Sequence, residues 1–138
     1  MTHTATAKTT AVRGGLLTAA ALLLATAAPA RAADLPADWL YLTVTRGDAR
    51  VDDTRGTLLL CDPPQGHARA ADACAELRAA GGDIGHIPPK DAICTMLYAP
   101  VTVHARGEWG GRQVAYERTF SNKCVLAART GAVFALDE

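Results

Sequence analysis

The feature that most constrains this 138-residue chain is its set of four cysteines, all of which come after residue 60: Cys61, Cys74, Cys94 and Cys124. An even number of cysteines in a small exported protein is typical of disulfide bonds. Four cysteines allow three pairings, and their spacing alone does not choose among them. We therefore expect two disulfides, whose partners the spacing leaves open.

Metal binding is the competing use of these cysteines. No two of them have the C-x2-C spacing that zinc sites favour. The three histidines after residue 32 are scattered along the chain: His67, His86 and His104. The sequence therefore predicts neither a metal site nor a cofactor.

The segment before residue 33 has the features of a secretory signal peptide. Lys8 and Arg13 form a basic start, residues 16–28 are an apolar run of Leu, Ala and Thr, and Ala30-Arg31-Ala32 suits a signal peptidase. The apolar run is shorter than the roughly 20 residues that cross a bilayer, so a retained anchor is the weaker alternative. We expect cleavage after Ala32, leaving residues 33–138 as one secreted, extracellular domain without membrane contact.

The charge of this domain argues against nucleic acid as a partner. The leading segment contains three of the chain's 14 basic residues and none of its 14 acidic residues, so the remainder has a net charge of about −3. Nucleic-acid-binding domains are normally basic.

The pattern of apolar residues predicts an α+β fold with about five strands and two helices. The expected strands cover residues 39–46, 56–61, 101–106, 113–120 and 133–136, and residues 107–112 join the third strand to the fourth as a hairpin. The first helix is expected over residues 69–80, and the second runs from a cap at Ser121 or Asn122 through Arg129. Residues 85–91, which include Pro88 and Pro89, are predicted to form a loop. The short connections favour antiparallel pairing.

No combination of residues indicates an active site. Ser121 is the chain's single serine, lacks a G-x-S-x-G context and is better explained as the helix cap. Asp52 and Asp53 are adjacent, so in a strand their side chains would point to opposite faces. A small exported enzyme is therefore the least favoured functional class.

The segment from Ile93 to Pro100 is apolar and invites two interpretations. Its composition alone favours the beginning of a buried strand. Pro100 argues against this, because proline lacks the backbone N–H that a central strand requires. The proline-containing loop before the segment also leaves it free to stand at the surface, where exposed apolar residues usually mark a binding site.

Several blocks of the sequence resemble the bacterial subtilisin inhibitor family of Streptomyces type. These blocks are Leu40-Tyr41-Leu42-Thr43-Val44, Cys61-Asp62-Pro63, Ala73-Cys74-Ala75-Glu76-Leu77 with Gly81-Gly82-Asp83, Cys94-Thr95-Met96-Leu97-Tyr98-Ala99-Pro100-Val101, and Tyr116-Glu117-Arg118-Thr119-Phe120-Ser121-Asn122-Lys123-Cys124. The last block is the most specific. Their order and spacing extend the resemblance over nearly all of residues 33–138.

The resemblance implies a five-stranded antiparallel sheet with two helices, disulfides Cys61–Cys74 and Cys94–Cys124, and a homodimer formed through the sheet. It also implies a secreted inhibitor of subtilisin-like serine proteases, not an enzyme, that binds as a substrate does. The scissile bond would be Met96–Leu97, with Met96 in the primary specificity pocket. The other loop residues facing the protease would be Ile93, Cys94, Thr95 and Tyr98.

Methionine as the primary residue makes chymotrypsin-like proteases secondary targets and disfavours trypsin-like ones, whose pocket takes Lys or Arg. Thr95 stands where the family often has proline, so the loop is expected to be slightly less stiff. The alternative function is an extracellular binding or structural module that has kept the scaffold without inhibiting a protease.

Overall fold

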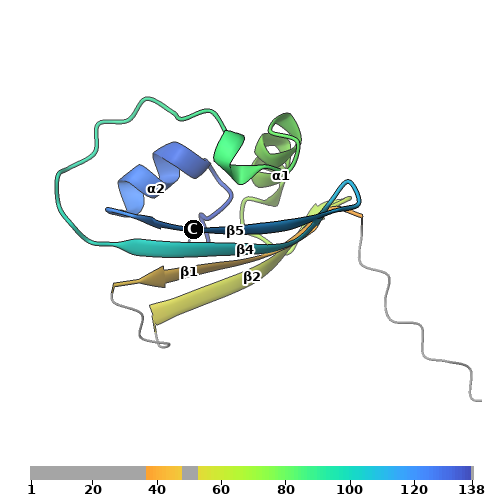
Figure 1. Ribbon diagram of the computed structural model, residues 1–138, viewed down its shortest axis with the longest axis horizontal. Coiled ribbons are helices and arrows are strands. Elements are labelled where there is room, and N and C mark those ends of the chain that lie inside the picture. The colour runs from red at the N-terminus through yellow and green to blue at the C-terminus, as the bar shows by residue number, and fades with distance from the viewer. Residues whose placement is uncertain (1–36, 48–52, 138) are drawn as a thin grey trace, which may run out of the picture. The chain divides into compact units, whose positions relative to one another are not determined.

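The computed structural model describes residues 37–47 and 53–137, and these form an antiparallel sheet covered by helices on one side (Figure 1). The strands are β1 (Trp39–Arg46), β2 (Thr54–Cys61), β3 (Pro64–Gln65), β4 (Val101–Trp109) and β5 (Arg112–Phe120). The helices are α1 (Ala70–Ala79), a 3-10 turn η2 (Ile84–His86) and α2 (Lys123–Thr130). The strand order is β3-β2-β1-β4-β5, with every neighbouring pair antiparallel. The predicted α+β fold with five strands, two helices and two disulfides is confirmed.

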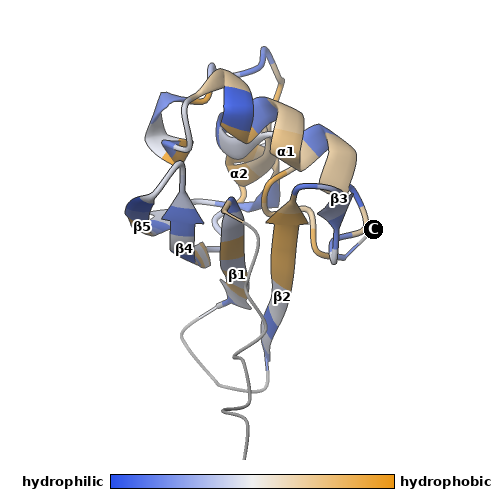
Figure 2. Ribbon diagram, turned by 90° about the vertical axis from the view of Figure 1, so that its right-hand side faces the viewer, coloured by the Kyte–Doolittle hydropathy of each residue, from blue (hydrophilic) through white to orange (hydrophobic). Residues whose placement is uncertain are grey.

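The sheet buries one face, as the alternation in β1 predicts. Leu40, Leu42 and Val44 are buried, whereas Tyr41 between them is half exposed. Both helices pack on the buried face (Figure 2), where α1 contributes Leu77 to the same apolar core. Alternation in a strand sends successive side chains to opposite faces, so this pattern fixes which face the helices cover.

The Cys61–Cys74 disulfide joins the end of β2 to the middle of α1, with 5.4 Å between the two Cα atoms. Both cysteines are buried in the core. This is the pairing that the family resemblance implied. Together with the Cys94–Cys124 disulfide, it leaves no free cysteine among the described residues.

The fifth strand is not the one that the sequence predicted. Residues 133–136 form successive turns, in which Val133 N–H donates to Thr130 O and Ala135 N–H to Ala132 O. Their apolar character reflects burial of Val133 and Phe134 in the core rather than pairing in the sheet. The fifth strand is β3, a two-residue segment beside β2. Its Pro64 is tolerated because an edge strand needs no donor on its outer side.

The connection between β4 and β5 is shorter than predicted. Both strands continue to a two-residue turn at Gly110-Gly111, so Trp109 pairs with Arg112 within the ladder. Both glycines have positive φ, 54° and 76°, as the tight hairpin turn requires. The predicted loop over residues 85–91 also begins with regular structure, because residues 84–86 form η2, where Asp83 accepts a hydrogen bond from Gly85 N–H at 2.9 Å.

Candidate functional site

The segment from Asp91 to Pro100 has neither helical nor strand structure and lies at the surface. Four of its large apolar residues are exposed, with relative solvent-accessible areas of 105% for Ile93, 99% for Met96, 69% for Leu97 and 74% for Tyr98. The interpretation as a buried strand, which composition favoured, is therefore wrong. An apolar group of this size that is kept out of the core is typical of a binding surface.

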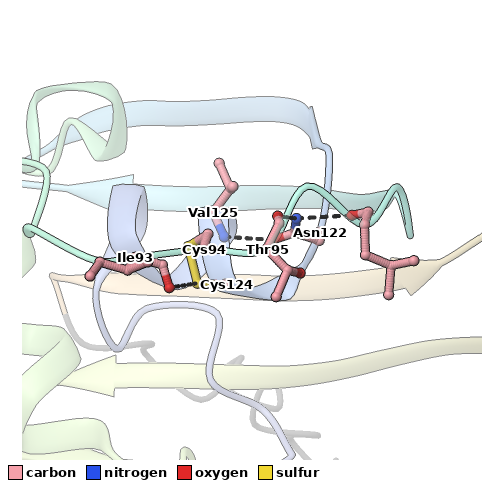
Figure 3. Close-up of a disulfide and its surroundings, with 7 residues drawn as sticks. Ile93, Cys94, Thr95, Asn122, Cys124 and Val125 are labelled. Carbon is pink, nitrogen blue, oxygen red and sulfur yellow. Dashed lines mark hydrogen bonds between the residues drawn. A yellow bond between two sulfur atoms is a disulfide. The ribbon is translucent and has the colours of Figure 1, made fainter.

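A disulfide fixes this segment to α2. Cys94 is joined to Cys124, the second residue of α2, with 5.6 Å between their Cα atoms (Figure 3). The bond closes a loop with a sequence separation of 30 residues, for which chain entropy predicts a stabilisation of roughly 3–4 kcal/mol. The pairing again agrees with the one that the resemblance implied.

The side chain of Asn122 joins the segment to the beginning of α2. Its amide nitrogen donates to the carbonyl oxygens of Thr95 at 3.2 Å and of Leu97 at 3.1 Å. Its Oδ1 accepts from Val125 N–H at 2.9 Å, which caps the helix (Figure 3). Asn122 is 8% exposed, so these bonds are largely shielded from water. One amide therefore holds the backbone on both sides of Met96.

The sequence predicted the helix cap but not the hydrogen bonds from Asn122 to the exposed segment. It gave Ser121 and Asn122 as alternative caps, and Asn122 is the residue that caps α2. The residue type could have indicated the hydrogen bonds to Thr95 and Leu97. An amide accepts a capping bond with its oxygen and donates two bonds with its nitrogen, whereas a serine hydroxyl has only one hydrogen to donate. Ser121 instead contributes its backbone carbonyl, which accepts from Ala99 N–H at 2.9 Å.

Backbone hydrogen bonds hold both ends of the segment. Before it, Lys90 N–H donates to Ala128 O at 2.8 Å. At its last residue, Gly47 N–H donates to Pro100 O at 2.9 Å, directly before β4 begins. The side chains of residues 96 and 97 thus project outward from a backbone that is fixed on either side.

The histidines belong to separate, local interactions. His67 lies between Arg69 N–H, at 2.8 Å from its Nδ1, and Val133 O, at 3.2 Å from its Nε2. His86 pairs with Asp83, and His104 lies 3.6 Å from a Glu117 oxygen. Within residues 37–47 and 53–137, no three His, Cys, Asp or Glu side chains gather as metal ligands.

Two predictions concern residues that the structure does not describe. The signal peptide and its cleavage site fall within residues 1–36, and Asp52 falls within residues 48–52. In the described part of the chain, no helix has the length and apolar character needed to cross a membrane.

Residues 36–122 match the family model described as subtilisin inhibitor-like. This chain belongs to the subtilisin inhibitor-like family. The inhibitor-like chain is 58% identical over 136 residues to a Streptomyces avermitilis protein provisionally named a serine protease inhibitor, covering 96% of this chain and 91% of that one. It is 42% identical over 139 residues to a Streptomyces coelicolor subtilase-type protease inhibitor, covering 94% and 96% of the two chains.

A solved structure is similar to the inhibitor-like chain over most of its length. Streptomyces caespitosus sermetstatin, crystallised in complex with Bacillus licheniformis subtilisin, aligns with a TM-score of 0.55 and 36% identity. The alignment covers 70% of this chain and 96% of sermetstatin. The family and these relatives are protease inhibitors and not enzymes, which confirms the functional class predicted from the sequence.

Proposed function

We propose that this protein is a secreted inhibitor of subtilisin-like serine proteases and that Met96–Leu97 is its reactive bond. The observation that supports this most strongly is the position of Asn122, whose amide bonds the backbone on either side of Met96 while that side chain is almost fully exposed. A protease could therefore reach the bond, while Asn122 holds the backbone carbonyls of Thr95 and Leu97 on either side of Met96.

The proposed mechanism is substrate-like binding. Residues 93–98 would lie in the protease's substrate groove as an added strand, with main-chain hydrogen bonds along its length. Because the segment is already fixed by Cys124 and Asn122, it loses little conformational freedom on binding, which raises affinity. Met96 would enter the primary pocket, and its unbranched, polarizable side chain suits a broad apolar pocket.

Slow net hydrolysis follows from the same contacts. Cleavage adds water across the Met96–Leu97 peptide, giving a Met96 carboxylate and a Leu97 amine. The Cys94–Cys124 disulfide and the Asn122 bond to Thr95 O would retain the first product. The Asn122 bond to Leu97 O would retain the second. Both ends then stay at high effective concentration, so the protease can rejoin them.

The choice of protease would depend mainly on two exposed side chains, Met96 and Ile93. Met96 would favour subtilisin-like enzymes first and chymotrypsin-like enzymes second, because it lacks the charge that a trypsin-like pocket binds. Ile93 would fill the apolar subsite three residues upstream. Thr95 and Cys94 would lie between them, and Tyr98 would lie beyond the cut.

We also propose that the chain is exported and forms a homodimer through the outer face of its sheet. Two disulfides suit an oxidising extracellular compartment. On the sheet face opposite the helices, Tyr41 is 50% and Leu58 is 36% exposed, and these two residues pair directly across β1 and β2. A second copy would remove this apolar surface from water. Sedimentation of the secreted protein tests this: a Tyr41→Lys variant is expected to be monomeric where the wild type is dimeric.

The test of the function is an active-site titration. The full chain is expressed in an exporting bacterial host, recovered from the medium and mixed with active-site-titrated subtilisin. Residual activity is expected to fall linearly to zero at one inhibitor chain per enzyme. Full activity at that ratio would overturn the inhibitor proposal and favour a binding module on the same scaffold. The amino-terminal residue of the recovered protein tests cleavage after Ala32.

A further inference from the structure

The carboxylate of Glu76, on α1, links three parts of the molecule: α1 itself, Lys90 before the exposed segment, and Ala132 after α2. Its Oε1 accepts from Lys90 Nζ at 2.7 Å. Its Oε2 accepts from Ala132 N–H at 2.6 Å, just after α2 ends. The Glu76 side chain is 21% exposed, compared with 59% for Lys90, so the carboxylate is the more shielded partner of the ion pair.

The absence of a side chain at Gly131 leaves room for the Glu76 carboxylate. Gly131 follows α2 with a φ of 58°, and a Cβ added there would overlap the Glu76 carboxylate. The C-terminal end of a helix has partial negative charge, which disfavours a carboxylate. The positive charge of Lys90 and the Ala132 N–H offset that cost. Lys90 is therefore part of what holds α1 against the end of α2.

Lys90 is in turn held at two points. Its side chain pairs with Glu76, and its backbone N–H donates to Ala128 O of α2. Four residues later, Cys94 is fixed to Cys124 of the same helix. Ile93 thus lies in a short span between two attachments to α2. Because Ile93 is fully exposed, the positions of these attachments set where its side chain points.

We propose that Glu76 is a positioning residue that acts through Lys90 to place Ile93 for an apolar subsite of the protease. This rests on the proposed inhibitor function. The partners of the Glu76 carboxylate are Lys90 and Ala132, neither of which belongs to the reactive bond, and the disulfide at Cys94 lies between Lys90 and Met96 along the chain. The effect of Glu76 on binding is therefore confined to the upstream subsite and leaves the primary pocket unaffected.

The test is a double-mutant cycle measured as Kd for subtilisin, using protein secreted from the full chain. Glu76→Ala is expected to raise Kd roughly five- to tenfold when residue 93 is isoleucine. In an Ile93→Ala background, the same change is expected to leave Kd within about twofold. A role in stability alone would lower the melting temperature in both backgrounds and would not make the change in Kd depend on residue 93.

Two further variants keep the result decisive. Glu76→Gln retains one acceptor oxygen for Ala132 N–H but loses the charge opposite Lys90, so its Kd is expected to approach that of Glu76→Ala while its melting temperature stays nearer the wild type. Lys90→Met removes the same ion pair by changing its more exposed partner. If Glu76→Ala fails to fold, Lys90→Met takes its place in the double-mutant cycle with Ile93→Ala.

Failure of the inhibitor function and failure of the positioning role of Glu76 give different results. A wild-type chain that leaves subtilisin active would overturn the inhibitor proposal and this inference with it. A wild type that binds tightly, together with a Kd change that is the same with isoleucine or alanine at position 93, would overturn the positioning role alone.

Discussion

The amide nitrogen of Asn122 lies 3.1 Å from the carbonyl oxygen of Leu97 and donates a hydrogen bond to it. The same nitrogen also bonds Thr95, so one buried side chain spans the exposed residue between them. The oxygen of the same amide caps α2 by accepting from Val125 N–H. The helix end and the protease-facing segment therefore depend on the same residue.

Asn122→Asp separates these two roles. A carboxylate still accepts from Val125 N–H and caps the helix, but it has no N–H for Thr95 O or Leu97 O. Two lost hydrogen bonds at about 0.5–1.5 kcal/mol each predict that Kd for subtilisin rises roughly 5- to 150-fold and that the reactive bond is hydrolysed faster. Enzyme-inhibition kinetics and mass spectrometry over hours measure both.

Asn122→Ala is the matched control for this variant, since it removes the cap as well. Losing the cap alone is expected to lower the unfolding free energy of Asn122→Ala by about 1 kcal/mol. Asn122→Asp keeps the cap, but its carboxylate is repelled by the carbonyl oxygens of Thr95 and Leu97, so the alanine variant shows the loss of the two bonds without that repulsion. If Asn122→Asp inhibits as tightly and as durably as the wild type, the amide does not hold the reactive bond.

Replacing Met96 by lysine should redirect inhibition toward trypsin. Met96 is 99% exposed, so the change needs no space inside the protein and should leave its stability within about 0.5 kcal/mol. A lysine at the primary position would pair with the buried carboxylate of a trypsin-like pocket. Kd values for trypsin and subtilisin are expected to change in opposite directions.

Thr95→Lys is the control for charge alone, because it adds the same side chain one position upstream. It is expected to leave trypsin uninhibited. Equal gains in trypsin inhibition from Met96→Lys and Thr95→Lys would show that residue 96 is not the primary residue.

Oxidation of Met96 should weaken inhibition. Met96 is the chain's only methionine apart from Met1, so mild peroxide treatment after signal cleavage modifies a single thioether. The sulfoxide places a polar group in an apolar pocket. A rise in Kd of at least tenfold is expected, reversed by methionine sulfoxide reductase. Met96→Leu protein given the same peroxide treatment should keep its Kd; a parallel loss in that variant would trace the effect to another residue.

His67 should make folding stability depend on pH. Its pKa is lowered from the ordinary value of 6.5 mainly by burial, with a smaller lowering contribution from Arg69, against a raising contribution from its bond to Val133 O. The unfolded chain therefore binds a proton at a higher pH than the folded chain does. His67 stabilises the fold fully above about pH 6.5, and that contribution is lost as the pH falls toward the lowered pKa.

Urea unfolding at pH 7.5 and pH 5 measures this effect, with His67→Gln as the reference. Glutamine does not titrate, so the fall in unfolding free energy between the two pH values should be larger for the wild type. An equal fall in both proteins would show that His67 contributes nothing to the pH dependence.

The sequence predicted most of the sheet because alternation specifies a strand and its buried face together. Leu40, Leu42 and Val44 are an example. The sequence pattern misplaced the fifth strand. Val133 and Phe134 are buried, and a buried position favours an apolar residue in a turn as much as in a strand. The disulfide pairing came from the family resemblance, because cysteine spacing leaves three pairings open.

The contacts that define the candidate site were harder to predict. Asn122 and Thr95 are 27 residues apart, and their hydrogen bond exists only because α2 folds back beneath the segment. Glu76 and Lys90 are likewise brought together because Lys90 bonds to Ala128 of α2 and Glu76 bonds to Ala132 just after that helix. Local sequence patterns specify elements, whereas such contacts depend on how the elements pack.

Identifying the bond that subtilisin cuts and rejoins tests directly whether Met96–Leu97 is the reactive bond. The secreted inhibitor is incubated with a small amount of subtilisin at mildly acidic pH until the ratio of cut to intact chains is constant. We predict, after reduction, a single new amino terminus at Leu97, with the two fragments joined before reduction by Cys94–Cys124. Purified cut inhibitor should return to the same ratio with fresh enzyme. Cleavage at any other bond, or a cut form that is never rejoined, would show that Met96–Leu97 is not a reversible reactive bond.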